Sequence, residues 1–184
     1  MNGGSDVVIL GIGSPFGADR LGWEVADLLR HSPVLARAGA STLAIYSLDR
    51  PGPALLNYLS NARVGVLVDA ICSTVHPPSQ ILRLEESGIA HVLKGELSSH
   101  GVGVADTLAL GRALGMLPDR VLLYGINVID DIEQMPAAVL IERLATEIQE
   151  EVAAYLGLTL TANTSQGAWC STPFAVEPNS NPKP

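Results

Sequence analysis

Long apolar runs, cysteine and basic residues are all scarce in this chain of 184 residues. No uninterrupted apolar stretch reaches the roughly 18 residues that a membrane-spanning helix needs. The opening residues, MNGGSD, lack the basic and apolar regions of a secretory signal peptide. We therefore expect a soluble, cytoplasmic protein that does not insert into a membrane.

Cysteine is too rare to build a disulfide framework. The two cysteines, Cys72 and Cys170, lie far apart, and Cys170 falls in a polar segment near the end of the chain. A reducing compartment suits such a pair better than an oxidising one, which agrees with a cytoplasmic protein.

Basic residues are outnumbered. Eleven Lys and Arg stand against nineteen Asp and Glu, and the formal net charge is −8. Proteins that bind the phosphate backbone of nucleic acids need clustered Lys and Arg to replace its counterions. We therefore expect no nucleic-acid partner.

Apolar residues are plentiful, and they are arranged in alternating strand-like and helix-like segments. This alternation predicts an α/β fold: a single-domain three-layer sandwich with a mostly parallel sheet between helices. We expect the domain to span residues 1–158 and a disordered polar tail to span residues 159–184. The predicted strands are 7–12, 42–48, 64–70, 81–84 and 121–126, and the predicted helices are 21–29, 53–59, 104–114 and 140–156.

The segment GIGSPFGADRLG, residues 11–22, follows the first predicted strand and resembles a phosphate-binding loop. Such a loop predicts a dinucleotide site, in which Asp49 would bind the ribose. Two features oppose this interpretation. Phe16 occupies the place of the third glycine, and Asp19 would repel a pyrophosphate at the start of the following helix.

Three polar residues follow predicted strands or precede a helix in a way that favours a common site. Asp19 follows the first strand, Asp69 ends the central strand, and His100 precedes the helix 104–114. In a parallel sheet, functional groups gather at the carboxyl ends of the strands. Two carboxylates and one imidazole are suitable ligands for a divalent transition metal and leave positions open for water or substrate.

Simpler interpretations exist for two of these residues. An Asp at the start of a helix commonly caps it, which would account for Asp19. His100, in the segment SSHG, would be a solvated loop residue. Asp69 needs a partner or an exit to the sheet edge, because a carboxylate after the apolar run VGVLV is costly to bury.

A cysteine hydrolase is an alternative, because Asp69, Cys72 and His76 cluster in the segment DAICSTVH. The spacing argues against it, since a nucleophile and its base usually come from separate elements. Cys72 is better explained as a small residue that fills space at a strand end. The HExxH helix of common zinc proteases is absent from the sequence.

Several motifs together resemble the hydrogenase maturation endopeptidases, which trim the large subunit of nickel-iron hydrogenases. They are LGIGSPFGADRLG, LVDA and SSHGVGVADTLALGRALG, with PGPALLNYL and RVLLYGIN in the same order. The similarity extends over roughly residues 6–157. It implies a single α/β domain with a twisted, mostly parallel sheet between helices.

The resemblance also implies a function for the three polar residues. Asp19, Asp69 and His100 correspond to the family's metal-binding acid, acid and histidine. They would recognise nickel already installed in the precursor of the hydrogenase large subunit, and the enzyme would then remove a C-terminal extension. Nickel would be supplied by that precursor, and another divalent metal is an alternative.

The glycine-rich loop departs from the family pattern. The family commonly has Asn in place of Ser14, two successive acids before the later glycine, and one more residue between them. Aligned backwards from Gly22, the ligand position falls on Asp19; aligned forwards from Gly13, it falls on Arg20. A guanidinium cannot ligate a cation, so we assign the position to Asp19.

The route of cleavage has two alternatives at this point. Either a water activated by the metal attacks the scissile carbonyl, or the acid pair works without a catalytic metal and nickel serves recognition alone. A non-catalytic nickel-binding or chaperone module of the same fold is the alternative to a peptidase. In each case we expect the protein to act as a monomer.

Overall fold

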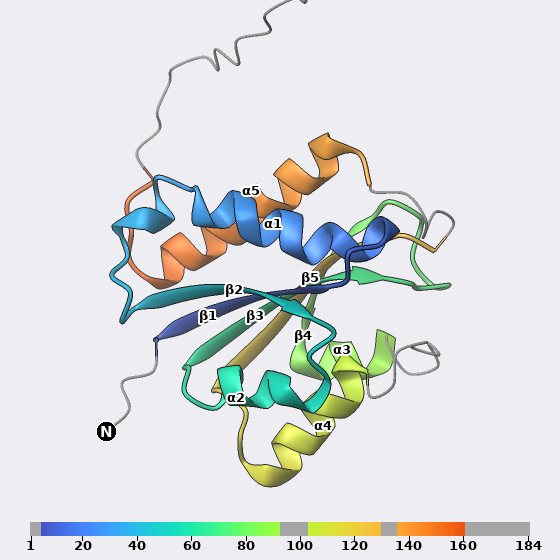
Figure 1. Ribbon diagram of the computed structural model, residues 1–184, viewed down its shortest axis with the longest axis horizontal. Helices are drawn as coiled ribbons and strands as arrows, with labels where there is room; N and C mark the ends of the chain where they lie inside the picture. Colours follow the sequence, from blue (N-terminus) through green and yellow to red (C-terminus); the bar gives the residue numbers. More distant parts are fainter. Residues whose placement is uncertain (1–4, 93–102, 130–135, 161–184) are drawn as a thin grey trace, which may run out of the picture.

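The structure is a computed structural model that describes residues 5–92, 103–129 and 136–160. Its strands form one sheet with the spatial order β2-β1-β3-β5-β4 (Figure 1). They are β1 (Val7–Gly13), β2 (Leu43–Asp49), β3 (Val64–Ile71), β4 (Ile81–Glu85) and β5 (Arg120–Asn127). All neighbouring strands pair in parallel except β4, which is antiparallel to β5. The prediction of a mostly parallel sheet is confirmed.

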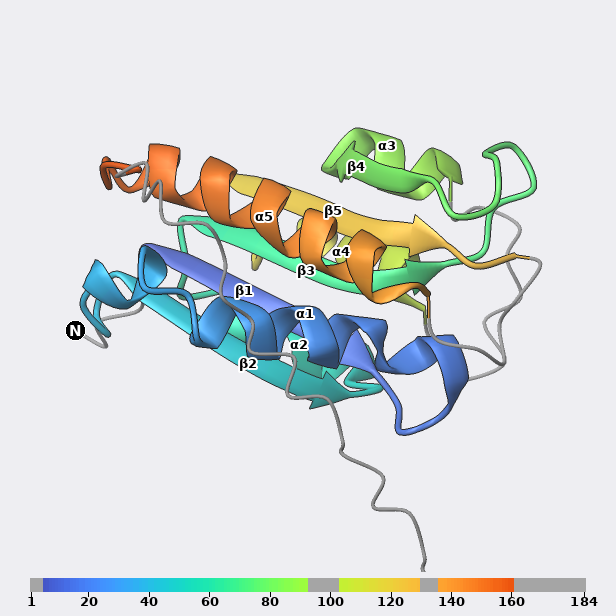
Figure 2. The same cartoon turned by 90° about the horizontal axis from the view of Figure 1, so that it is seen from above.

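Helices cover both faces of this sheet (Figures 1 and 2). α1 (Leu21–Arg30) and α5 (Ala138–Tyr155) lie on one face, and α2 (Leu55–Leu59), α3 (Glu86–Val92) and α4 (Val104–Leu114) lie on the other. Successive residues of β1 therefore enter different cores: Ile9 packs on the side of α1 and α5, and Leu10 on the side of α2 and α4. A strand buried on both faces is apolar throughout, as the run VVIL is. The three-layer sandwich is confirmed.

The predicted elements recur with small changes at their ends. The helix predicted for 53–59 begins as a 3-10 turn, η3 (Gly52–Ala54), and continues as α2. α3 was not predicted, because seven residues are too few to display a helical period; its Ile89 is buried against the second core. Further 3-10 turns are η1 (Gly17–Arg20) and η2 (Leu35–Arg37). Among the helices of the described ranges, none has both the length and the apolar character to cross a membrane.

The strand order reverses between β1 and β3. From β1 the chain passes through α1 to β2 on one side, whereas β3 pairs with the opposite side of β1. The connections that leave β1 and β3 thus run to different faces of the sheet. In α/β folds, a crevice for ligands opens at such a switch point, outside the carboxyl ends of the two strands.

Candidate functional site

Asp19 and Asp69 both lie at this switch point. Asp19 belongs to η1, which follows β1, and Asp69 lies near the carboxyl end of β3, the strand adjacent to β1. The two carboxylates are close enough for the charge of Asp19 to act on Asp69. The sequence prediction that these two residues approach one another is confirmed, while their roles stay predictions.

Asp19 is held by the loop that precedes it. The buried hydroxyl of Ser14 donates a hydrogen bond to Asp19 Oδ2 at 2.8 Å, and the N–H of Ser14 donates to the carbonyl of Asp19 at 3.2 Å. The N–H of Asp19 donates to the carbonyl of Phe16 at 3.1 Å. No side chain caps η1 or α1, so Asp19 is not a helix cap. Its carboxylate is fixed by Ser14 instead.

Asp69 is the member of the pair whose ionisation is suppressed. Burial, first, and the negative charge of Asp19, second, raise the pKa of the Asp69 carboxyl to about 8, although the N–H of Ala70 donates to its Oδ1 at 2.8 Å and acts in the opposite direction. Asp69 therefore keeps its proton at neutral pH while no cation is near. Carboxyl groups with such raised pKa values are concentrated at functional sites.

Glycines bring the backbone of η1 and α1 onto β1. A Cβ on Gly13 would lie 2.0 Å from the carbonyl oxygen of Asp19, and one on Gly11 would lie 2.1 Å from that of Gly22. A Cβ on Gly22 would in turn lie 2.5 Å from the carbonyl oxygen of Val68 in β3. Gly11 and Gly13 lie within β1, so they are strand residues and not part of a turn. They are needed for the close approach that carries Asp19 to the switch point.

The two possible alignments of the glycine-rich loop lead to different places in the structure. Asp19 faces Ser14 and influences Asp69, whereas the guanidinium of Arg20 forms an ion pair with Glu24, one turn along α1. Only the assignment to Asp19 puts a possible metal ligand beside Asp69. Ser14, which departs from the family pattern, supplies the hydrogen bond that orients it.

Arg50 is a site residue that the sequence did not single out. It follows β2 in a left-handed backbone conformation with φ of 42°, and its N–H donates to the carbonyl of Gly13 at 3.1 Å. Its Nε donates to Asp49 Oδ1 at 2.7 Å, which lowers the pKa of Asp49 and raises that of Arg50; the charge of Asp19 also raises the pKa of Arg50. Asp49, the predicted ribose ligand of a dinucleotide site, is thus paired with a cation.

Asn127, at the end of β5, was also missed by the sequence analysis. Its buried side chain accepts a hydrogen bond from the N–H of Ser73 at 2.9 Å and donates to the carbonyls of Ser73, His76 and Pro77 at 2.9, 2.7 and 3.2 Å. One amide therefore holds the connection that follows β3. The run RVLLYGIN contained the residue, but a polar end to an apolar strand does not reveal its partners.

His100, the third predicted ligand, lies outside the described residues, as do the other four of the first five residues of the segment SSHGVGVADTLALGRALG, residues 98–102. Within the described ranges, no three His, Cys, Asp or Glu side chains converge as a metal-binding group. Of the alternative triad, Cys72 packs against the core beside α1 and α5, and the backbone carbonyl of His76 binds Asn127. The interpretation of Cys72 as a residue that fills space is consistent with this position.

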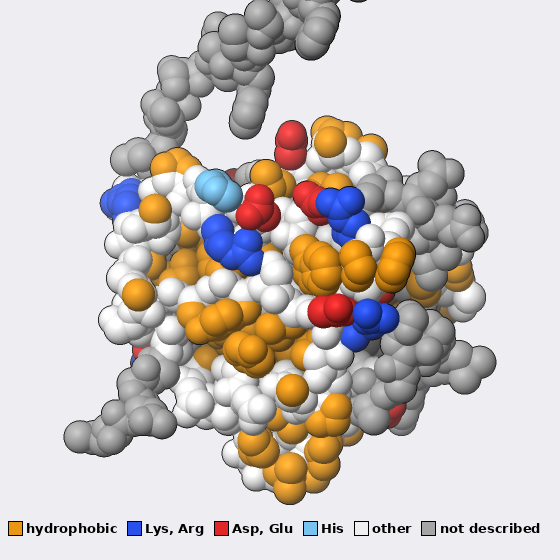
Figure 3. All heavy atoms as spheres, viewed as in Figure 1, with side chains coloured by type: hydrophobic (Ala, Val, Ile, Leu, Met, Phe, Trp, Pro, Cys, Tyr) orange, Lys and Arg blue, Asp and Glu red, His pale blue; other side chains and the backbone are white. Residues whose placement is uncertain are grey.

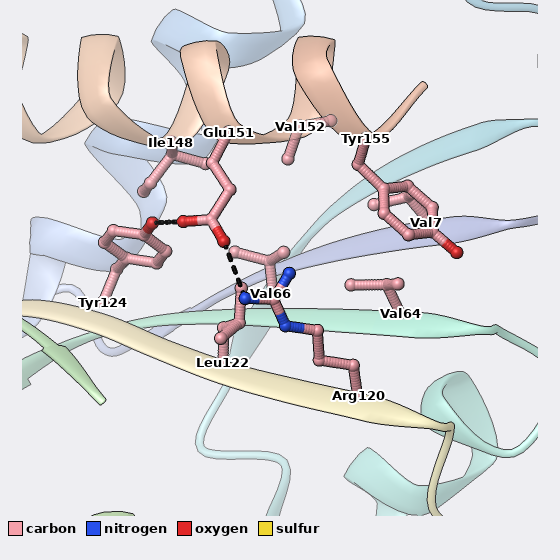
Figure 4. A pocket seen from close by; sticks show the side chains of 10 residues that line it. All are labelled: Val7, Val64, Val66, Arg120, Leu122, Tyr124, Ile148, Glu151, Val152 and Tyr155. Carbon is pink, nitrogen blue, oxygen red and sulfur yellow. Dashed lines mark hydrogen bonds and ion pairs between the residues drawn. The ribbon is translucent and has the colours of Figure 1, made fainter. Parts of the chain in front are cut away.

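A small apolar cavity lies away from these residues (Figure 4). It is lined by Val7, Val64 and Arg120, the first residues of β1, β3 and β5, and by residues of α5. Since the strands are parallel, the cavity lies toward the amino ends, opposite to Asp19 and Asp69. Its polar wall, Glu151 bound to Tyr124 and Arg120, ties α5 to the sheet. We assign it a structural role.

Comparison with known proteins finds relatives in sequence and in fold. No family model matches the sequence. The hydrogenase 2 maturation protease of Escherichia coli (strain K12) is 24% identical over 121 residues, which are 65% of this chain and 71% of the relative. The relative is a protease and so a hydrolase, which supports protease activity in hydrogenase maturation.

Solved structures show the same fold. The hydrogenase maturating endopeptidase HybD from E. coli superposes with a TM-score of 0.63 at 20% identity, covering 82% of this chain and 91% of its own. An endopeptidase from Escherichia coli gives 0.67 at 19% identity, covering 83% and 94%. The NiFe hydrogenase maturation protease HybD from Thermococcus kodakarensis gives 0.55 at 22%, covering 82% and 97%. In sequence and in fold, the resemblance of this chain to the hydrogenase maturation endopeptidases is confirmed.

Proposed function

We propose that this chain is an endopeptidase that removes the C-terminal extension of a nickel-iron hydrogenase large-subunit precursor after nickel has been inserted. The observation that carries the proposal is the pair Asp19 and Asp69 at the switch point of a fold shared with hydrogenase maturation endopeptidases. The motifs that resemble the family contain both residues.

The donor set suits a cation carried by the substrate. Asp19 is oriented by Ser14, and Asp69 is held protonated by burial and by the charge of Asp19. A divalent cation between the two carboxylates would offset the effects of burial and of the Asp19 charge on Asp69, because it stabilises the ionised form of each acid. Carboxylate and imidazole are suitable ligands for nickel, and His100 is the proposed third ligand. Nickel bound in the precursor would thus distinguish the nickel-loaded precursor, which is the substrate, from the nickel-free one.

Hydrolysis needs few groups beyond these. A water molecule adds its oxygen to the scissile carbonyl carbon, the C–N bond breaks, and the water's proton is transferred to the leaving amine. Carboxyl groups at the switch point are suitable to accept and return that proton. When bound, the nickel of the precursor supplies positive charge near the scissile bond. We also propose that the chain acts as a monomer. Its composition leads us to propose the cytoplasm as its compartment.

The proposal is tested with nickel-loaded and nickel-free large-subunit precursor. Each precursor is incubated with the intact protein, with Asp69→Ala, and with Asp119→Ala, an exposed acid before β5 at the opposite edge of the sheet. Mass spectrometry then measures the loss of a C-terminal peptide. We expect cleavage of the nickel-loaded precursor alone, by the intact protein and by Asp119→Ala, and a decrease of at least about 100-fold for Asp69→Ala.

Two results contradict the proposal. Equal cleavage by Asp69→Ala removes Asp69 from the site. Failure of the folded, intact protein to cleave any cognate precursor, while it still binds the nickel-loaded form, leaves a non-catalytic nickel-binding module as the function.

A further inference from the structure

We propose that Phe16, Val75 and Val139 form an apolar rim around the two carboxylates, and that this rim binds uncharged, apolar side chains of the polypeptide to be cleaved. The inference rests on the proposed function, which it extends from the reaction to the residues that hold the substrate. The sequence analysis gave none of these three side chains a part in binding substrate.

The rim residues are the most exposed large apolar side chains in the described ranges. Val75 is 77% exposed, Phe16 71% and Val139 68%, and the next in order, Leu114, is 59% exposed. Single exposed apolar residues are ordinary on protein surfaces. Here the three highest values occur together at one edge of the sheet, and such a concentration is typical of an interaction site.

The topology places them at that edge although the sequence separates them. Phe16 follows β1, Val75 follows β3, and Val139 lies in the first turn of α5, which comes after β5. These three strands are parallel, so their carboxyl ends lie at the same edge of the sheet (Figures 1 and 2). Asp19 and Asp69 lie at this edge too, between the connections that carry the rim.

Two of the rim residues are on backbone that is held in place. The carbonyl of Phe16 accepts the N–H of Asp19, so Phe16 and Asp19 belong to one hydrogen-bonded turn. Val75 lies between Ser73 and His76, whose backbone groups bind Asn127. A side chain held outward on ordered backbone loses little conformational entropy when a partner covers it, which favours binding.

Charge points to an uncharged, apolar stretch of polypeptide as the occupant. Among the described residues, the basic side chains near this edge are each in an ion pair: Arg20 with Glu24, Arg50 with Asp49, and Arg143 with Glu147. Acidic and basic side chains lie beside one another on the face in Figure 3, with apolar side chains between them. An anionic partner, such as a nucleic acid or a lipid surface, would find these cations already neutralised.

The test compares two triple variants. In the rim variant, Phe16→Ser, Val75→Ser and Val139→Ser are combined. The control variant removes three less exposed apolar side chains from helix surfaces, with Leu28→Ser, Leu110→Ser and Leu114→Ser. Circular dichroism establishes that both fold. Cleavage of nickel-loaded precursor then gives kcat and KM separately, and binding to immobilised precursor is measured for the intact protein and for both variants.

We expect the rim variant to raise KM and to weaken binding by at least about tenfold with kcat within about twofold, because the rim contacts substrate away from the reacting atoms. The control variant should stay within about twofold of the intact protein in each quantity. Unchanged KM and binding in the rim variant overturn the inference and leave the proposed function standing.

If the intact protein cleaves no precursor, the proposed function is wrong, and precursor binding alone then tests the rim. Weaker precursor binding by the rim variant then still supports the rim, whereas equal binding, or none by either protein, overturns it. Sedimentation distinguishes a further occupant: an intact dimer that becomes monomeric in the rim variant means that the rim joins two copies of this chain, which also overturns the inference.

Discussion

The buried carboxyl group of Asp69 lowers the free energy of unfolding at neutral pH, and this loss can be measured. In the folded protein its pKa is about 8 against a usual value of 3.8, so the unfolded chain ionises at a pH where the folded chain must keep the proton. The contribution of Asp69 to the free energy of unfolding is therefore most favourable below about pH 4, and it is lost as the pH rises toward 8. A group kept for packing alone would not carry such a cost.

We expect Asp69→Asn to raise the thermal midpoint of the metal-free protein at about pH 7 by several degrees, since the amide has no ionisation to suppress. At about pH 3 the gain should nearly vanish, because there the unfolded wild-type chain is also largely protonated. Thermal melts across this pH range measure the difference. A loss of stability at both pH values would show that the carboxyl group supports the fold.

At the scale of elements, the position of Asp19 depends on how closely η1 and α1 approach β1. The glycine-rich segment contributes Gly11 and Gly13 to this approach. Both belong to an extended strand, and their function is to leave room for the carbonyl oxygens of Asp19 and Gly22. A side chain at either position would push the helix and its carboxylate away from β3.

Gly13→Ala tests this arrangement. Its Cβ would lie 2.0 Å from the carbonyl oxygen of Asp19, so η1 must move, and we expect a loss of about 1–3 kcal/mol in the free energy of unfolding together with reduced cleavage. The matched control is Gly39→Ala, where the nearest atom, Ser41 Oγ, lies at 3.9 Å. Urea denaturation and the cleavage assay measure the two effects. Equal behaviour of both variants would contradict the close approach.

At the scale of the whole molecule, one carboxylate joins α5 to the strands β4 and β5. Glu151 accepts hydrogen bonds from Arg83 Nε and Nη2 at 2.8 and 2.7 Å, pairs with Arg120 at 3.1 Å and binds the hydroxyl of Tyr124. Its hydrogen bonds to Arg83, first, lower the pKa of Glu151 to about 2. This network lies near the amino ends of the strands, remote from the proposed reaction.

We expect Glu151→Gln to lower the thermal midpoint at about pH 7 by a few degrees, with cleavage at saturating substrate unchanged. The folded pKa is depressed, so the stabilisation is present above about pH 4.5 and is lost as the pH falls toward 2. The gap between the proteins should narrow over that acid range. Glu150→Gln, at an exposed position on the same helix, is the control. A gap that is constant with pH would exclude an electrostatic origin.

The sequence by itself determined the layers and one edge of the site. Apolar runs of strand length alternating with helical periods predict a parallel sheet between helices, because a strand covered on both faces must be apolar throughout. Asp69 could be placed near a strand end because it closes the apolar run VGVLV, where a carboxylate is costly to bury. These features are local, and a pattern of neighbouring residues is enough to express them.

Only the tertiary structure decided how the site is held together. Asn127 binds backbone groups 50 to 54 residues away, and the N–H of Arg50, which follows β2, binds the carbonyl of Gly13 in the neighbouring strand β1. The proposed rim combines side chains from two connections and from the first turn of α5. Such contacts depend on which strands become neighbours and on the distance between their backbones. No periodicity records these quantities, because they arise only when the chain has folded.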